Sequence, residues 1–407
     1  MCKKITFSII IPTFNSLDTI ERSVSSVLNQ TFKNFEILII DDGSDIKTKK
    51  KQNKIFAKND KIRLFSNSKN YGVSKSRNFA INRARGEFIV FLDSDDYFIS
   101  TYLENIYKII KNKDTQLIIA PNKKINKKHS DTKLYKEQFT KNKLSFFCWN
   151  YVLKKSFILK EKIFFKNIKV FEDQLFVLKI FEKVKKYSFY KKKFIVRTQS
   201  FKSLGRLTNH HSCYAYALIT KEIAHLIHKT RDPNFIKYLK RKLIDAINFF
   251  GLFSLICNSK RIQQYSILLS NTNLFKKKPK SKNLNLIIRL FKNKNLEQLN
   301  STLKKNNLKN KTINIYSLSL SSRILIELLK IKKIKIDKIF DNNELFHGKI
   351  YKNTRILDKP NVKDIKNRSL ILPMKFKKFF LKKKIFKRNR KKFIFFKFYN
   401  LSNFVFR

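Results

Sequence analysis

Short apolar runs alternate with polar, helix-like segments in the N-terminal part of the chain. Four of these runs have the length of buried strands and are rich in β-branched and aromatic side chains. They cover Phe7–Ile11, Phe35–Ile40, Ile62–Phe65 and Phe88–Leu92. Between them, apolar residues recur at helical spacing, as at Ile20, Val24 and Val27, and Ser74–Ala84 can form a further helix. Alternating strands and helices predict an α/β fold with a mostly parallel, doubly wound sheet.

The fourth of these strands runs directly into three carboxylates, Asp93, Asp95 and Asp96, and the second strand also ends in acidic residues. Residues i and i+2 of an extended segment project to the same side, so Asp93 and Asp95 are expected to face one point while Ser94 turns away. Carboxylate oxygens suit a hydrated divalent cation such as Mg²⁺ or Mn²⁺. Ligands of open α/β sheets lie beyond the carboxyl ends of the strands. The alternative is a solvated acidic turn that caps the next helix.

Four segments that contain these strands and turns follow one another in a recognisable order. They read S-I-I-I-P-T-F-N, L-N-Q-T-F-K-N-F-E-I-L-I-I-D-D-G-S, N-Y-G-V-S-K-S-R-N and G-E-F-I-V-F-L-D-S-D-D. Together they resemble the successive motifs of family 2 glycosyltransferases, whereas each segment alone would be a weak signal. The resemblance implies the GT-A nucleotide-sugar-binding fold. It also implies an inverting transferase that takes a sugar from a nucleoside diphosphate donor, most often a uridine one.

The same resemblance assigns donor-binding roles to residues at the strand ends. It implies that Pro12, Thr13 and Asn15 line the nucleoside pocket. Asp42 would face the base in that pocket, and Asp93 would lie near the ribose. The alternative for Asp42 is a structural role in the tight turn that follows the second strand.

The donor diphosphate also requires positive charge, because it gains negative charge as the glycosidic bond breaks. The resemblance implies that a divalent metal, Mn²⁺ or Mg²⁺, supplies this charge as a Lewis acid, held by Asp95 with help from Asp93. Arg77 can add a guanidinium fork to the diphosphate, and a lysine would not match that geometry. A surface salt bridge is the alternative for Arg77.

An inverting displacement needs a base that takes the proton of the attacking hydroxyl. The segments F-F-C-W-N-Y-V-L-K-K-S and K-I-F-F-K-N-I-K-V-F-E-D-Q-L-F resemble the acceptor half of the same family, whose base is the second acidic residue of an E-D pair. That residue is Asp173 here, and the helix that begins after it is expected to keep Asp173 ionised. Alternatively, Glu172 and Asp173 only cap this helix. Trp149 either floors an acceptor pocket or belongs to the core.

The charge of the chain is extreme. Its 407 residues include 91 Lys and Arg against 29 Asp and Glu, which gives a formal net charge of +62. Such an excess predicts a polyanionic partner, which could be nucleic acid, an anionic membrane surface or an acidic glycan. However, the abundance of Lys, Asn, Ile and Phe beside only 6 Gly and 6 Pro is also what AT-rich coding would produce without any such partner.

Cysteine usage and hydropathy bear on location. The 4 cysteines are scattered and form no C-x-x-C pair, which predicts free thiols in a reducing compartment. The apolar run at the start is too short for a signal peptide, and no uncharged stretch approaches the ~20 residues that span a bilayer. We therefore expect a cytoplasmic protein that can bind the inner face of the cytoplasmic membrane peripherally.

The resemblance to a transferase fades from His210 onward. Helices are expected over Tyr214–Ile227 and Phe235–Leu255, and the polar stretch Asn271–Lys311 offers a boundary, with parts such as Leu284–Phe291 able to be helical. The predicted domains are therefore a catalytic domain at 1–209, a helical region with linker at 210–310, and a third domain at 311–407.

The third predicted domain carries a second α/β signal. The pieces T-I-N-I-Y-S-L-S-L-S-S-R-I-L-I-E-L-L and I-D-K-I-F-D-N-N predict a strand, a helix and a strand, and they resemble a Rossmann-like half-domain. Its turn holds Ser317, Ser319 and Ser321 where glycines would let the backbone approach a pyrophosphate. We therefore expect a smaller, degenerate and non-catalytic Rossmann-like domain.

Lysine and arginine alternate with phenylalanine over Lys375–Phe398. Such a segment can rest on an anionic bilayer, bind nucleic acid, or be only a basic strand and tail of the third domain. We favour the membrane, because members of the resembling family often act on lipid-linked glycans. The function expected from the whole chain is transfer of a hexose from a UDP-sugar to a glycan or lipid-linked glycan in surface polysaccharide or lipooligosaccharide synthesis. The alternative is a catalytically inert, basic protein that binds glycan or nucleic acid.

Overall fold

The protein packs into two compact units, which are described separately. The computed structural model describes residues 4–120, 145–190, 192, 194–198, 210–270, 281–306, 312–316, 319–341, 350–351, 353–357, 370–373 and 393–396. The first unit comprises Met1–Thr198 with Leu226–Lys240, and the second comprises Gln199–His225 with Arg241–Arg407. The three-part division at 209 and 310 stays a prediction from the sequence.

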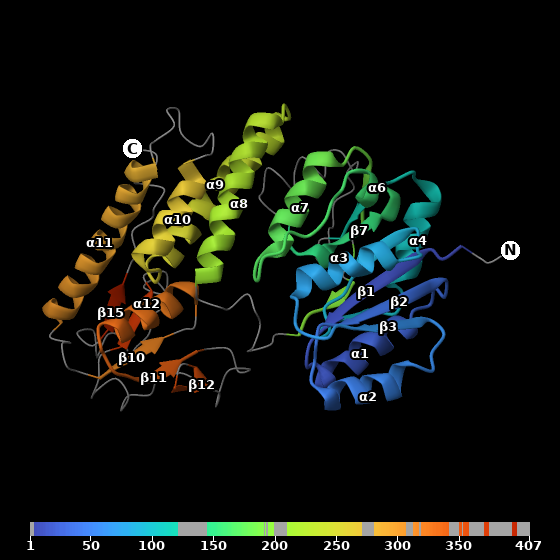
Figure 1. The fold of residues 1–407 in the computed structure, drawn as a ribbon, viewed down its shortest axis with the longest axis horizontal. Coiled ribbons are helices and arrows are strands. Elements are labelled where there is room, and N and C mark those ends of the chain that lie inside the picture. The colour runs from blue at the N-terminus through green and yellow to red at the C-terminus, as the bar shows by residue number, and fades with distance from the viewer. Residues whose placement is uncertain are drawn as a thin grey trace. The chain divides into compact units, whose positions relative to one another are not determined.

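The first unit is built on a seven-stranded mixed sheet (Figure 1). Its strands, in spatial order, are β3 (Ile62–Ser66), β2 (Phe35–Asp41), β1 (Phe7–Thr13), β4 (Phe88–Phe91), β7 (Tyr151–Lys154), β6 (Leu117–Ile119) and β8 (Tyr187–Phe189). The first four are parallel, and β7 is antiparallel to both of its neighbours. The predicted α/β class, the four predicted strands and the mostly parallel sheet are confirmed.

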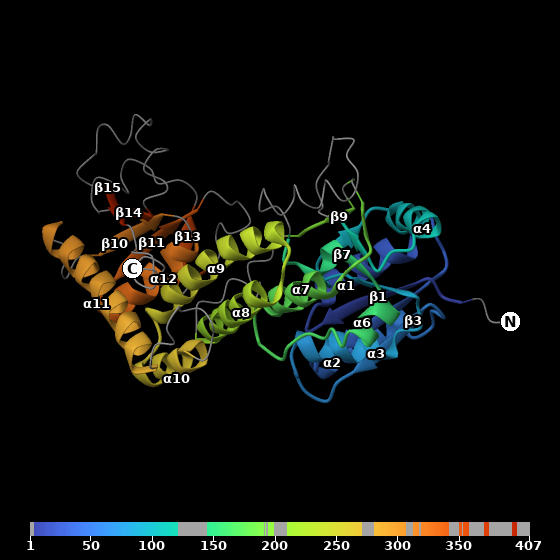
Figure 2. The same cartoon turned by 90° about the horizontal axis from the view of Figure 1, so that it is seen from above.

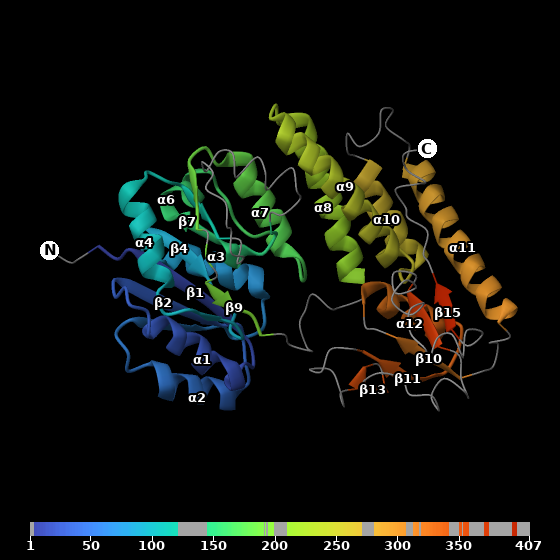
Figure 3. The same ribbon diagram turned by 180° about the vertical axis from the view of Figure 1, so that it is seen from behind.

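Helices cover both faces of this sheet. They are α1 (Leu17–Leu28), α2 (Ile46–Phe56), α3 (Val73–Arg83), α4 (Tyr102–Asn112), α6 (Lys155–Lys160) and α7 (Glu172–Lys183). Helices α1 and α2 lie on one face and α3 lies on the other (Figures 1 and 3). Since both faces are covered, every residue of β1, β2 and β4 is buried, which explains why these strands read as continuous apolar runs.

The register of the central strands brings their polar ends to one edge. Thr13 at the end of β1 lies opposite Asp41 at the end of β2, and the backbone N–H of Asp42 donates to the carbonyl of Thr13 at 2.8 Å. On the other side of β1, Leu92 donates to the carbonyl of Ile10 at 3.0 Å, so the chain leaves β4 at the same edge. Polar residues that follow three different strands therefore converge.

The second unit contains a six-stranded sheet, again mostly parallel (Figure 3). Its strands, in spatial order, are β12 (Ile350–Tyr351), β13 (Thr354–Leu357), β11 (Ile336–Phe340), β10 (Ile313–Tyr316), β14 (Leu370–Pro373) and β15 (Phe393–Phe396). Helix α12 (Leu320–Ile331) connects β10 to β11, as predicted. Within the basic and aromatic segment Lys375–Phe398, the residues of β15 form an edge strand, while 374–392 and 397–407 lie outside the described residues.

Four long helices precede this sheet along the chain (Figure 2). They are α8 (His210–Lys229), α9 (Pro233–Ser254), α10 (Ser259–Ser270) and α11 (Ser281–Lys305). The predicted boundary stretch Asn271–Lys311 thus contains a helix of 25 residues, longer than the predicted piece Leu284–Phe291. No helix in the described part of the chain combines the length and the hydropathy needed to cross a membrane.

Candidate active site

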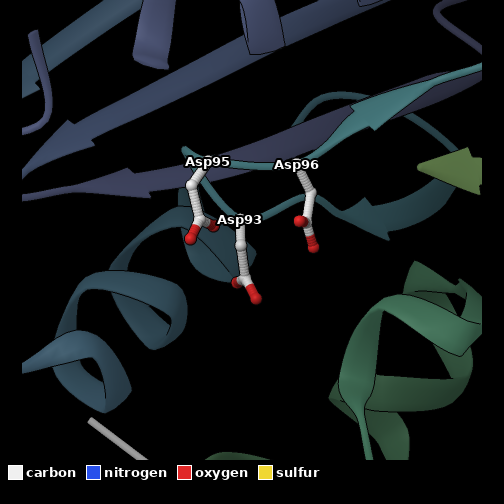
Figure 4. Close-up of side chains that lie close together, drawn as sticks. All are labelled: Asp93, Asp95 and Asp96. Atoms are coloured by element: carbon white, nitrogen blue, oxygen red, sulfur yellow. The ribbon is translucent and has the colours of Figure 1, made fainter. Parts of the chain in front are cut away.

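Three carboxylates gather on the turn that follows β4. One oxygen from each of Asp93, Asp95 and Asp96 lies within 4.8 Å of the others. All three side chains project to the same side of the turn (Figure 4). Ser94 is directed elsewhere, since its hydroxyl donates to the hydroxyl of Ser16 at 3.2 Å. The expected convergence of Asp93 and Asp95 is therefore found, with Asp96 as a third member.

The backbone explains why Asp96 joins the group. The segment is a turn and not the extended continuation of the strand that spacing predicted, because the N–H of Asp96 donates to the carbonyl of Asp93 at 3.1 Å. A turn of this kind brings its first and fourth residues close together. Asp96 is also anchored, since its Oδ1 accepts the backbone N–H of Thr198 at 2.8 Å.

Burial raises the pKa values of two of these carboxylates, Asp95 and Asp96. It raises the pKa of Asp96 to about 7, and the negative charges of Asp93 and Asp95 act in the same direction. Burial and the charge of Asp93 also raise the pKa of Asp95, against the positive charges of Arg197 and Arg22. Raised carboxylate pKa values mean that the turn needs more positive charge than the neighbouring arginines supply. A divalent cation would supply that charge, and oxygen ligands fit Mg²⁺ or Mn²⁺.

Arg77 on α3 links this turn to a second acidic pair. Its Nη2 lies 2.9 Å from Oδ1 of Asp93. Its Nη1 lies 2.7 Å from Oε1 of Glu172 and 2.9 Å from Oδ1 of Asp173. Arg77 is only 3% exposed, so the alternative of a surface salt bridge is wrong. Its expected contact with a diphosphate stays a prediction, and both Nη atoms are already engaged by carboxylates.

Asp173 lies at the start of α7, as predicted. The residue before the helix is Phe171, and no side-chain hydrogen bond caps this helix end, so the acidic pair does not serve as the cap. The remaining oxygen of Asp173, Oδ2, accepts the backbone N–H of Cys148 at 3.3 Å. A residue more than 90 positions away in the sequence, Arg77, thus connects Asp173 with Asp93.

The protonation of Asp173 differs from the sequence-based expectation. Burial raises its pKa to about 7, and the charge of Glu172 adds to this effect, while the guanidinium of Arg77 opposes it. Burial therefore outweighs the favourable helix N-terminus. The expectation that this position keeps Asp173 ionised is wrong below about pH 7.

Asp42 holds together the loop beside the site. Its Oδ1 accepts hydrogen bonds from Nδ2 of Asn67 at 2.8 Å and from the N–H of Tyr71 at 3.0 Å, and its Oδ2 accepts from the N–H of Gly72 at 2.7 Å. Gly43, at φ +79°, permits this approach, because a Cβ there would lie 2.2 Å from the backbone carbon of Lys69. The role of Asp42 toward a base stays a prediction.

The turn after β1 contains the other residues that were predicted to line the nucleoside pocket. Pro12 and Thr13 are buried at the end of β1. Asn15 adopts a left-handed backbone at φ 47°, and its N–H donates to the hydroxyl of Ser44 at 2.8 Å, which ties this turn to the loop after β2. Between them Phe14, which belongs to the same turn, is 47% exposed.

Arginine and aromatic side chains surround the acidic turn, and reasoning from the sequence did not select most of them. Arg22 donates from Nη2 to the carbonyl of Asp95 at 2.8 Å. The guanidinium carbon of Arg197 lies 4.9 Å from the ring centroid of Phe147 and 5.2 Å from that of Trp149. Trp149 is buried and belongs to the core, whereas Phe147 is exposed. Arg22 lies within α1 and Arg197 lies far along the chain, so no local pattern indicates that both meet the acidic turn.

Comparisons with known proteins agree with this geometry. Residues 8–200 match glycosyl transferase family 2. The chain is 31% identical over 225 residues to the cholesterol galactosyltransferase of Borreliella burgdorferi. The aligned region covers 50% of this chain and 62% of that protein. It is 45% identical over 98 residues to the Escherichia coli enzyme UDP-Glc:alpha-D-GlcNAc-diphosphoundecaprenol beta-1,3-glucosyltransferase WfaP, which covers 24% of this chain and 38% of that enzyme. The chain thus spans less than two thirds of either relative.

A solved structure supports the fold. The crystal structure of S. aureus TarS 1–349 in complex with UDP-GlcNAc superposes with a TM-score of 0.50 at 18% sequence identity, over 72% of this chain and 92% of that one. The match in sequence includes β1, β2 and β4 together with the acidic turn and the Glu172–Asp173 pair. Residues 8–200 therefore form a glycosyltransferase domain of family 2 with the GT-A fold.

Proposed function

We propose that the protein transfers a hexose from a UDP-sugar to a hydroxyl group of a glycan or lipid-linked glycan, with inversion at the anomeric carbon. The observation that carries this proposal is the acidic turn at the strand ends, joined through Arg77 to the buried carboxylate of Asp173. In the reaction, the bond between the anomeric carbon and the diphosphate oxygen breaks while the acceptor oxygen bonds to the opposite face of that carbon. The acceptor proton passes to Asp173.

Asp173 has the properties that a general base requires. Its pKa of about 7 lies close to a physiological operating pH, where a base is both substantially ionised and able to hold the proton that it receives. Its Oδ1 is fixed by Arg77 and its Oδ2 by the N–H of Cys148. Both contacts favour the charged form and limit the rotation of the carboxylate.

Asp93, Asp95 and Asp96 are proposed to hold one divalent cation, Mn²⁺ or Mg²⁺. Three oxygen donors within 4.8 Å and the raised pKa values of Asp95 and Asp96 fit such a cation. When bound, the cation stabilises the negative charge that develops on the leaving UDP. The protein's own contribution is to orient these oxygens, through the bond from Thr198 to Asp96 and the bond from Arg22 to the carbonyl of Asp95.

The nucleoside of the donor is proposed to lie between two loops. Pro12, Thr13 and Asn15 line one side, and Asp42, which organises the loop up to Gly72, lines the other. The choice of a uridine donor is supported by the names of similar proteins, which include a UDP-Glc-dependent enzyme and a UDP-GlcNAc complex. The lipid-linked acceptor is supported by the diphosphoundecaprenol acceptor in the name of the E. coli relative. Asp93 is assigned to the ribose as well as to the cation.

The test is release of UDP from UDP-glucose, UDP-galactose, UDP-GlcNAc and UDP-GalNAc, measured with Mn²⁺, with Mg²⁺ and after chelation. We expect one donor to be turned over with either cation and none after chelation. Acceptor identity is then tested with a synthetic GlcNAc-diphosphate lipid and its dephosphorylated analogue. Absence of turnover across the donors, together with UDP binding that is unchanged in Asp95→Ala, would favour the inert binding protein instead.

Contact with an anionic membrane surface is also proposed, on the basis of the basic and aromatic segment Lys375–Phe398. In a flotation experiment, the protein should bind vesicles in which about one fifth of the lipid is anionic. It should not bind vesicles of phosphatidylcholine alone. Replacing the lysines between 375 and 392 by glutamine is expected to abolish flotation while leaving β15 in place. Flotation that survives this replacement would contradict the proposal.

A further inference from the structure

Arg77 is enclosed by acidic groups from two other segments of the chain. It projects from α3 and is 3% exposed. Asp93 comes from the turn after β4, and Glu172 and Asp173 come from the start of α7. One buried guanidinium therefore faces three carboxylates, which is an unusual excess of negative charge around a single cation.

The two Nη atoms of the guanidinium contact two different parts of the site. Nη2 donates to Asp93 at 2.9 Å, while Nη1 is shared by Glu172 at 2.7 Å and Asp173 at 2.9 Å. The ring of Phe165 covers the guanidinium, with its centroid 5.2 Å from Cζ. Among the described residues, Nε has no hydrogen-bond partner and is buried. No edge of this guanidinium remains both free and exposed for a phosphate group.

We propose that Arg77 is a positioning residue that fixes the distance between the cation-binding turn and the base Asp173, and that it is not a ligand of the donor diphosphate. This inference rests on the proposed function. In an inverting displacement, the leaving group and the attacking hydroxyl lie on opposite sides of the anomeric carbon, so the groups that serve them must keep a fixed separation. A planar guanidinium with two Nη atoms sets that separation, which a single ammonium group does not.

Glu172 completes the arrangement by holding the guanidinium from the side of α7. Phe171, the residue before this helix, adopts a left-handed backbone at φ 62°, which is rare and strained for a large side chain. This conformation directs two consecutive acidic residues toward Arg77. Strained backbone of this kind is common next to residues that position catalytic groups.

The test separates turnover from donor affinity. Arg77→Lys keeps the charge and loses the fork, and Glu172→Gln keeps the shape and loses one ion pair. We expect turnover of the best UDP-sugar to fall about 10²-fold in Arg77→Lys, as for an error of about 1 Å in substrate geometry. In Glu172→Gln we expect a fall of about tenfold, because Asp93 and Asp173 keep their contacts. In both variants the Kd for UDP with Mn²⁺ should stay within about threefold of wild type.

Arg63→Lys is the matched control. Arg63 also pairs with a buried glutamate, Glu36, at 2.9 Å and lies over a phenylalanine ring, that of Phe65, at 5.3 Å. It is far from the strand ends that form the site, because Glu36 is the second residue of β2. Turnover by Arg63→Lys should equal that of wild type, so a general effect of replacing an arginine that pairs with a buried glutamate is measured separately.

Three results would overturn the proposal. The first is a Kd for UDP that rises tenfold or more in Arg77→Lys. The second is tighter UDP binding by Glu172→Gln, since a diphosphate ligand would be released by loss of its acidic partner. The third is unchanged turnover in both variants. If Arg77→Lys does not fold, Glu172→Gln decides alone, because it removes a negative charge from an acidic cluster. Failure of the wild-type protein to turn over any donor would instead reject the proposed function.

Discussion

Two buried charge clusters lie at opposite ends of the central sheet. They differ in how far the negative charge of their carboxylates is compensated by neighbouring groups. At the amino end, Glu36 of β2 accepts a hydrogen bond from Ser8 at 2.6 Å and pairs with Arg63 at 2.9 Å. Burial acts to raise the pKa of Glu36, but these partners and the N–H of Arg85 outweigh burial, so its pKa is lowered. This carboxylate is fully compensated.

The cluster at the carboxyl end is not compensated. Asp95, Asp96 and Asp173 all have raised pKa values, with burial as the largest cause in each. The same fold thus contains one ionic cluster that satisfies its charges internally and one that leaves negative charge unbalanced. Unbalanced carboxylates at a strand end are where catalytic or metal-binding chemistry is expected, whereas a balanced cluster belongs to the structure.

The largest effect is expected at the base. Asp173→Asn should lower turnover about 10³-fold, because an amide does not accept the proton of the attacking hydroxyl. The measurement is the initial rate of UDP release with saturating donor. Asp232→Asn is the control, since Asp232 also lies at a helix start and accepts the N–H of Asn234 at 2.8 Å. If the two variants behave alike, Asp173 has only a local structural role.

The next effect concerns the acidic turn. Asp95→Asn should lower turnover about 10²-fold and raise the Mn²⁺ concentration needed for half-maximal rate, because one charged oxygen ligand is lost. Asp341→Asn is the control, since Asp341 directly follows β11 in the second sheet. If turnover falls equally in the two variants, the effect is not specific to the strand ends of the first sheet, and the special role of the acidic turn is contradicted.

A pH profile tests the unbalanced cluster directly. Asp173 acts as a base only when it is ionised, and its pKa is about 7. Turnover should therefore fall about tenfold from pH 6 to pH 5 and level off above about pH 8. A rate that stays constant down to pH 5 would show that the base has an ordinary carboxylate pKa. Circular dichroism across the same range is the control for unfolding.

The smallest effect on turnover is expected at the balanced cluster. Glu36→Gln should leave turnover within about twofold of wild type but lower the free energy of unfolding by about 2 kcal/mol at pH 7, because the partly buried Arg63 loses its charged partner. The folded pKa of Glu36 is lowered, so its contribution is present above the unfolded pKa and is lost as pH falls through the folded value. Urea titrations at pH 7 and pH 4 should show a smaller difference at pH 4. Glu87→Gln, at a more exposed ion pair with Lys4, is the control.

Much of the catalytic domain could be predicted from local patterns. Strands buried on both faces leave continuous apolar runs, so β1, β2, β3 and β4 were found with errors of one or two residues at their ends. In the second sheet β10 and β11 were predicted because a helical pattern separates them, whereas the apolar residues of β13 and β15 stand among charged ones with no such pattern beside them. The alternation of strand and helix patterns therefore decides how much of this sheet the sequence reveals.

The site was predictable residue by residue but not as an arrangement. Asp93, Asp95 and Asp173 follow recognisable motifs, yet the position of Arg77 between them depends on a contact across 96 residues of sequence. Spacing also failed at Asp96, because a turn hydrogen bond replaced the assumed extended backbone. The raised pKa of Asp173 depends on burial by distant segments, which no local pattern reports.

A substitution at Gly43 would affect the loop that Asp42 holds but not the acidic turn or Asp173. Its backbone touches Lys69 and Asn70, and the loop that passes there is the one that Asp42 fastens. One added methyl group would displace this loop, which is proposed to lie next to the nucleotide, and would leave the acidic turn and Asp173 on other segments unchanged. Recognition of the nucleotide and the chemistry at the sugar could therefore change independently over evolutionary time.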